Sequence, residues 1–209
     1  TTTEYKKLSH ALSGKGACAL FGLPASGRAQ VYAALCRQLD KPLCIVTPGE
    51  AEATRFAADL NTLGIPAAVF PARDYVLRPI EGTAREYEYR RLAVLGELVG
   101  GRLRAVAVPA EALTQFTTPK EDFCANTRTL HAGDTLLRDD LLAALFGAGY
   151  TRRAQVDGPG QFSVRGDIVD IFAPDQKMPV RMEFWGDEID TLHTFDLTTQ
   201  RREDAIDKF

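Results

Sequence analysis

The sequence is poor in the residue types that build metal and disulfide sites. Only four of its 209 residues are cysteine and three are histidine, and no Cys-x-x-Cys pair occurs. We therefore expect no metal site and no bound cofactor. Cys18, Cys36 and Cys44 lie within apolar segments, which predicts reduced thiols that fill a core.

Long apolar runs and a strong net charge are also missing. No run approaches the ~20 apolar residues of a membrane helix, and the first 30 residues show no secretory signal pattern. Together with the reduced thiols, this predicts a cytoplasmic protein that does not enter a membrane. The net charge of −3 and pI of about 5.7 argue against a general nucleic-acid binder, and a hydrophobic content of 45% excludes a disordered chain.

The charge that is present is divided unevenly along the chain. Residues 1–117 contain 14 basic and 11 acidic residues, whereas residues 118–209 contain 11 basic and 17 acidic residues. At roughly 100–200 residues per domain, the length suits one large domain or two small ones. The asymmetry favours two units with different roles.

The first half alternates between patterns of strands and helices. Short apolar runs predict the strands, and apolar residues at helical spacing between them predict the helices. The predicted strands are 16–21, 43–47, 67–70 and 104–108, and the predicted helices are 26–39, 50–63, 83–99 and 111–116. This order predicts βαβ units and a mostly parallel sheet.

The second half has a different pattern. A helix is predicted at 138–146, and strands are predicted at 126–131, 161–165, 168–172, 179–185 and 188–195, with turn signals between the later ones. This order predicts an α+β unit with an antiparallel sheet. The fold class of the whole chain is therefore α/β followed by α+β.

One segment of the first half resembles a phosphate-binding loop without its chemistry. Gly22 and Gly27 have the spacing of a P-loop between an apolar run and a helix. A working loop has Lys after the second glycine and then Ser or Thr, but here Arg28 and Ala29 follow. Ser26 precedes that glycine, and no hydroxyl follows it to bind Mg²⁺. We therefore expect no catalytic residues and no hydrolysis by this chain.

Two alternatives to a purely structural turn stay open for this half. The helix N-terminus after Gly22 could retain affinity for a nucleotide or phosphate. The mild excess of basic residues could instead serve a DNA-binding accessory domain, whose binding would depend on salt.

Strand alternation in the second half gathers a set of interface-type residues. Because side chains alternate across a strand, Arg165, Arg181 and Trp185 are predicted on one open face of the sheet. Arginine and tryptophan dominate the energetics of protein interfaces. The alternative is a solvated Arg181–Glu183 pair with Trp185 packed beneath a loop.

Acidic residues gather around the same strands. They are Asp167, Asp170, Asp187, Glu188 and Asp190. Their spacing follows no cation-binding loop, so a solvated acidic rim is expected.

Several stretches in the second half carry a family resemblance. They are 160–172 (GQFSVRGDIVDIF), 179–190 (PVRMEFWGDEID), 194–196 (TFD) and 199–201 (TQR). They resemble domain 2 of the UvrB-like module, which the excinuclease subunit UvrB shares with the transcription-repair coupling factor Mfd. The first half is similar to the degenerate helicase-like domain 1A that precedes this module, through Arg73-Asp74-Tyr75, the helix containing Arg90-Arg91 and the segment 109–115.

Two departures from UvrB point to the coupling-factor branch. UvrB has an intact P-loop and a long aromatic hairpin in its first domain, whereas segment 75–83 is too short for such a hairpin. The resemblance thus implies the N-terminal UvrB-like part of a coupling factor. It implies domain 1A at 1–117, domain 2 at 118–199 and, at 200–209, the start of a return segment to domain 1 called 1B.

The resemblance also implies a function. Domain 2 of this family binds UvrA through arginines on one sheet face. Arg165 and Arg181 match the positions of these arginines, and Trp185 stands at a position that is aromatic, often Phe, in the family. The expected role is a non-catalytic, monomeric adaptor of transcription-coupled nucleotide excision repair. RNA polymerase and DNA would be bound by other parts of the full-length family protein, an ATP-dependent DNA translocase.

Overall fold

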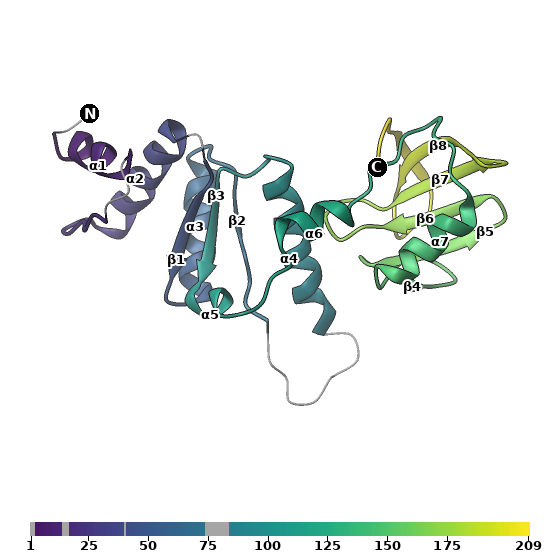
Figure 1. The fold of residues 1–209 in the computed structure, drawn as a ribbon, viewed down its shortest axis with the longest axis horizontal. Helices are drawn as coiled ribbons and strands as arrows, with labels where there is room; N and C mark the ends of the chain where they lie inside the picture. The colour runs from purple at the N-terminus through teal and green to yellow at the C-terminus, as the bar shows by residue number, and fades with distance from the viewer. Residues whose placement is uncertain (1–2, 14–16, 40, 74–83) are drawn as a thin grey trace. The chain divides into compact units, whose positions relative to one another are not determined.

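The computed structural model describes residues 3–13, 17–39, 41–73 and 84–209, which form two compact units (Figure 1). One unit contains Thr1–Tyr87 and Val94–Phe116, and the other contains Glu88–Ala93 and Thr117–Phe209. The predicted features that involve Gly16, Asp74, Tyr75 and the segment 75–83 lie outside the described residues.

The first unit is built on a small parallel sheet. Its strands are β1 (Leu43–Thr47), β2 (Ala67–Val69) and β3 (Ala105–Pro109), in the order β1-β3-β2. Its helices are α1 (Thr3–Ser13), α2 (Ala25–Gln38), α3 (Glu50–Thr62), α5 (Ala110–Leu113) and both ends of α4 (Ala84–Val99), whose residues Glu88–Ala93 are assigned to the other unit. The sequence prediction of parallel βαβ units is confirmed for these three strands.

Helix α3 shows how the sequence positions this sheet. Its buried residues recur at helical spacing, and Gly64 ends it with a φ of +74°, which glycine adopts without strain. The Asn61 side chain then donates to the carbonyl of Ala67 at 2.8 Å and accepts from its N–H at 3.0 Å. These two bonds fix the start of β2 directly after the helix.

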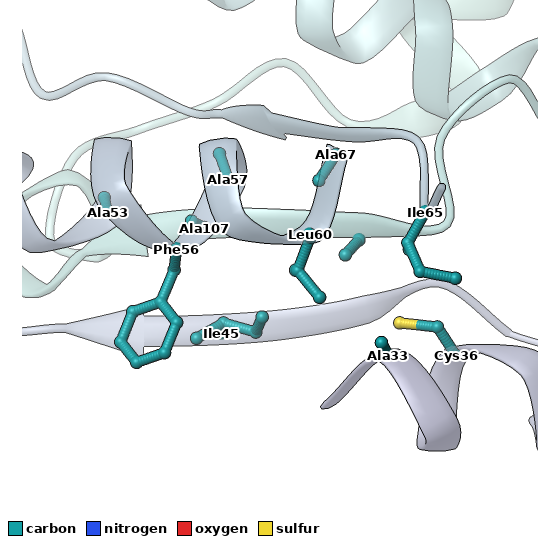
Figure 2. Packing of buried hydrophobic residues seen from close by; sticks show 11 residues of the cluster. Ala33, Cys36, Ile45, Ala53, Phe56, Ala57, Leu60, Ile65, Ala67 and Ala107 are labelled. Atoms are coloured by element: carbon teal, nitrogen blue, oxygen red, sulfur yellow. The ribbon is translucent and has the colours of Figure 1, made fainter. Parts of the chain in front are cut away.

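The core of this unit lies between α2, α3 and one face of the sheet. Figure 2 shows Phe56 and Leu60 of α3 pointing toward β1, with the Phe56 ring beside Ile45 and Cys36 of α2 at the end of the cluster. Arg104 stabilises the C-terminal end of α2. Its guanidinium donates to the carbonyl of Cys36 at 2.6 Å, near the end of the helix. The opposite face of the sheet packs Val106 and other side chains against α4.

Two sequence expectations for this unit are wrong. Residues 17–21 form neither a helix nor a strand, and their side chains are exposed, as Phe21 shows most clearly. Cys18 and Cys44 are exposed, and only Cys36 of the three cysteines lies in the core. Cys44 follows the alternation of β1, in which Ile45 faces the core and its neighbours face away from it.

The second unit contains a six-stranded sheet whose strands lie in sequence order. They are β4 (Thr151–Arg152), β5 (Gln161–Arg165), β6 (Ile168–Phe172), β7 (Val180–Trp185), β8 (Glu188–Phe195) and β9 (Arg202–Ala205). β4 runs parallel to β5 and every later pair is antiparallel, so the sheet is mixed rather than purely antiparallel. The helices are α6 (Lys120–Ala125) and α7 (Arg138–Gly147).

The two faces of this sheet are covered to different extents. Leu141 and Leu145 of α7 cover one face, where Phe162, Met182 and other apolar side chains are buried. On the other face, a smaller cluster joins Val156, Phe172, Phe195 and Leu197. The second face therefore has only a local apolar cover, and it also carries polar and charged side chains.

Residues 126–131 do not form the predicted strand. His131 makes an isolated bridge to Lys208, and the helix α6 ends just before this segment. Within the predicted return segment 200–209, Arg202–Ala205 form β9, which is hydrogen-bonded to β8. Over the described ranges, no helix combines the length and hydrophobicity of a membrane span.

Cysteine reactivity provides a test of the first unit. Burial raises the pKa of the Cys36 thiol and shields it from reagents, whereas Cys18, Cys44 and Cys124 are exposed. We expect iodoacetamide to modify these three and to spare Cys36 in the native protein near neutral pH, as read by mass spectrometry. All four should react in denaturant. Labelling of native Cys36 as fast as Cys18 would contradict this packing.

Candidate protein-binding face

The segment that resembles a P-loop has a turn at Gly22 that leads directly into α2. Gly22 has a φ of +82°, and α2 already begins at Ala25, so Gly27 lies inside the helix rather than in a loop. The N–H of Arg28 donates to the carbonyl of Pro24 at 3.1 Å. This intrahelical bond removes one of the N–H groups that a phosphate would need.

The two residues after Gly27 lie in different surroundings. Ala29 is 3% exposed and packs as part of the core, while the Arg28 guanidinium lies 3.9 Å from the Glu52 carboxylate. Arg28 also lines a hollow of about 310 Å³ together with Leu20–Leu23 and Tyr32. One guanidinium beside mostly apolar groups offers no ligand for Mg²⁺. Over residues 3–13, 17–39, 41–73 and 84–209, no cluster of metal-ligating side chains occurs.

The sheet of the second unit brings Arg165 and Arg181 together. Ser163 of β5 lies opposite Asp170 of β6, and Asp170 lies opposite Arg181 of β7. All three side chains are on the sheet face away from α7, and Arg165 follows two residues after Ser163 on the same face. The predicted proximity of the two arginines is therefore confirmed, and it is organised by a carboxylate between them.

Asp170 is the centre of this polar cluster. It is 1% exposed, and its Oδ1 accepts from Nε of Arg181 at 2.7 Å. Its Oδ2 accepts from Nη2 of Arg181 at 3.0 Å and from Nη2 of Arg165 at 2.6 Å. A buried carboxylate is stable only with such partners. The expectation of a solvated acidic rim is wrong for Asp170, while Asp167, Asp187, Glu188 and Asp190 are exposed.

The two arginines differ in exposure, and here the sequence expectation was wrong for Arg181. Its side chain is 10% exposed, because it lies over the Phe195 ring at 4.8 Å and its Nη1 donates to the carbonyl of Gln200 at 3.2 Å. The Arg165 side chain is 47% exposed. Arg165 can therefore contact a partner directly, while Arg181 mainly holds the face together.

The turn over Arg181 explains its burial. Asp196 accepts from the N–H and Oγ1 of Thr199 at 2.7 and 2.9 Å, and these bonds lower the pKa of the Asp196 carboxyl. Gln200 follows with a φ of +58°, and its Nε2 donates to the carbonyl of Leu197 at 2.8 Å. This geometry aims the Gln200 carbonyl at Arg181, which alternation along the strands could not predict.

Trp185 is exposed, as the sequence pattern predicted. It ends β7 before a tight turn at Gly186, whose φ is +64°, and 83% of its surface is accessible. The Arg165/Trp185 face, as we call the α7-distal face that carries these two side chains, also contains Glu183. Glu183 pairs with Arg202 of β9 and accepts from Thr191 Oγ1 at 3.3 Å.

The roles of Asp170 and Arg202 were not predicted from the sequence. The sequence does contain a sign of the role of Asp170. It is a single carboxylate between Val169 and Ile171 in an otherwise apolar strand, which indicates a buried charge with partners. The sequence contains no such sign for Arg202, because β9 has no apolar alternation and all its residues are exposed.

Stability measurements should separate the two arginines. Arg181→Ala leaves buried Asp170 without its bidentate partner and should lower the free energy of unfolding by about 3 kcal/mol. Arg165→Ala removes a half-exposed partner and should cost about 1 kcal/mol or less. Urea unfolding followed by circular dichroism measures both. Equal losses for the two variants would refute this difference in role.

Comparisons with known proteins identify relatives of this chain. The family model described as the UvrB interaction domain matches residues 129–209, which include β4–β9 and α7. The chain is 38% identical to the transcription-repair-coupling factor of Mycobacterium bovis over 192 residues, which are 88% of this chain and 15% of that protein.

Two further relatives carry the same description. The transcription-repair-coupling factor of Myxococcus xanthus is 34% identical over 196 residues, and that of Bacillus subtilis is 29% identical over 184 residues. These matches cover 88% and 87% of this chain, and the chain spans about 16% of the length of each relative. The chain therefore belongs to the transcription-repair-coupling factor family, and its residues 129–209 form a UvrB interaction domain.

Proposed function

We propose that this chain is a non-catalytic adaptor module that binds UvrA in transcription-coupled nucleotide excision repair. The observation that carries the proposal is the Arg165/Trp185 face, which presents a fixed guanidinium and an exposed indole on a rigid sheet. Residues 1–117 would act as a degenerate helicase-like scaffold, residues 118–199 as the adaptor and residues 200–209 as the start of a return segment. RNA polymerase and DNA would be bound by other parts of a full-length protein.

The chemistry of this face indicates what its partner must offer. Arg165 can donate to a carboxylate, and Trp185 can bury a large apolar ring while its indole N–H finds an acceptor. Such side chains contribute most when they become desolvated at the centre of an interface. A complementary surface on UvrA would therefore combine an acidic group with an apolar pocket.

Binding measurements with purified UvrA test the proposal. Arg165→Ala and Trp185→Ala should each weaken binding by about 2 kcal/mol, roughly thirtyfold in Kd, because each removes a central contact. Calorimetry or biolayer interferometry measures the change. Arg181 is unsuitable for this test, because its loss would damage the fold.

Matched surface variants control the experiment. Arg152→Ala removes an exposed arginine that lies opposite Phe162 and therefore on the α7 side of the sheet, and Leu137→Ala removes an exposed apolar side chain next to α7. Both should bind UvrA like the wild type. If Arg165→Ala and Trp185→Ala also bind like the wild type, the assignment of the face is wrong.

The non-catalytic part of the proposal rests on the segment from Gly22 to Ala29. Arg28 pairs with Glu52, and buried Ala29 has no ligand atom for Mg²⁺. We expect no Mg²⁺-dependent ATP hydrolysis above background by the purified chain, measured by phosphate release. Hydrolysis that disappears in the Arg28→Ala variant would show a working site and overturn this part.

A further inference from the structure

Asp170 links the exposed part of the Arg165/Trp185 face to its buried part. Its Oδ1 accepts from Nε of Arg181 at 2.7 Å, while Oδ2 accepts from both guanidiniums, at 2.6 Å from Arg165 and 3.0 Å from Arg181. Ser163 lies beside the same oxygen at 3.5 Å. The carboxylate is therefore surrounded by donors and has no direct access to a partner.

The two guanidiniums use this carboxylate differently. Arg181 binds it through Nε and Nη2 and gives Nη1 to the Gln200 carbonyl, so every nitrogen of its guanidinium is engaged. Within the part of the chain that the structure describes, Arg165 engages Nη2 alone and keeps its other N–H groups for a ligand. An arginine held at one nitrogen retains a planar donor edge in a fixed orientation.

Resting on the proposed binding of UvrA, we infer that Asp170 is a positioning residue for that interaction. It acts through Arg165, whose free guanidinium edge it holds toward the partner before binding. A flexible arginine would lose side-chain freedom on association, and this loss opposes binding. Asp170 removes most of that cost in the free protein.

Charge makes the inference testable, because positioning and simple attraction predict opposite signs. Asp170 and the two arginines carry a net charge of +1, and Asp170→Asn raises it to +2. If the arginines acted only as positive charges toward an acidic partner, this variant would bind more tightly. If Asp170 positions Arg165, the variant binds more weakly despite its greater positive charge.

We expect Asp170→Asn to weaken UvrA binding by about tenfold, measured on folded protein whose thermal unfolding has been recorded. In an Arg165→Ala background the same substitution should change Kd by less than about twofold, because the residue through which it acts is gone. Asp139→Asn on α7 makes the same change of charge outside the Arg165/Trp185 face and should bind like the wild type. A general structural defect would weaken binding in both backgrounds.

Arg165→Lys supplies a second measurement if Asp170→Asn does not fold. It keeps the charge and leaves the buried pair of Asp170 and Arg181 intact, but a lysine has no second donor edge. We expect it to bind about tenfold more weakly than the wild type.

The outcomes distinguish the positioning role of Asp170 from the proposed binding of UvrA. Wild-type affinity in Arg165→Lys, tighter binding by Asp170→Asn, or an equal loss in both backgrounds would overturn the positioning role and leave UvrA binding intact. Absence of binding by the wild type would overturn the proposed function and the inference together.

Discussion

The buried carboxylate of Asp170 is the constraint on which the second unit depends. An ionised group that is 1% exposed is tolerated only if donors surround it, and the sheet register brings Ser163 and Arg181 opposite it. Arg181 in turn needs the Phe195 ring and the Gln200 carbonyl, so the turn at 196–200 closes over it. Burial of one charge thus determines the geometry of a whole sheet face.

Periodicity was enough to predict most elements of both units. The alternation in 161–165, 168–172 and 188–195 corresponds to β5, β6 and β8, and the spacing of Phe56 and Leu60 predicted α3. The prediction of a strand at 17–21 was wrong, and this apolar run is exposed. Apolar composition alone cannot show whether a neighbouring strand is present to pair with it. Periodicity also missed β9, whose residues are exposed on both sides and show no apolar pattern.

The Arg165/Trp185 face was predictable in part, for a physical reason. Alternation fixes the side of a sheet on which a residue lies, which was correct for Arg165, Arg181 and Trp185, but it cannot show what covers that side. The cover over Arg181 comes from a turn with a positive φ at Gln200, which favours glycine or asparagine and was therefore not expected at glutamine. Sequence patterns thus identified the face, whereas only the tertiary structure shows that Arg165 on it is exposed and Arg181 is buried.

The strand order β4-β5-β6-β7-β8-β9 bears on how the second unit folds. Every strand pairs with its neighbours in sequence, so each pairing closes only a short loop and loses little chain entropy. In the first unit, β3 must instead insert between β1 and β2, which requires longer crossover connections. The second unit therefore has a topology that can assemble rapidly, because its sheet can form from one strand to the next along the chain.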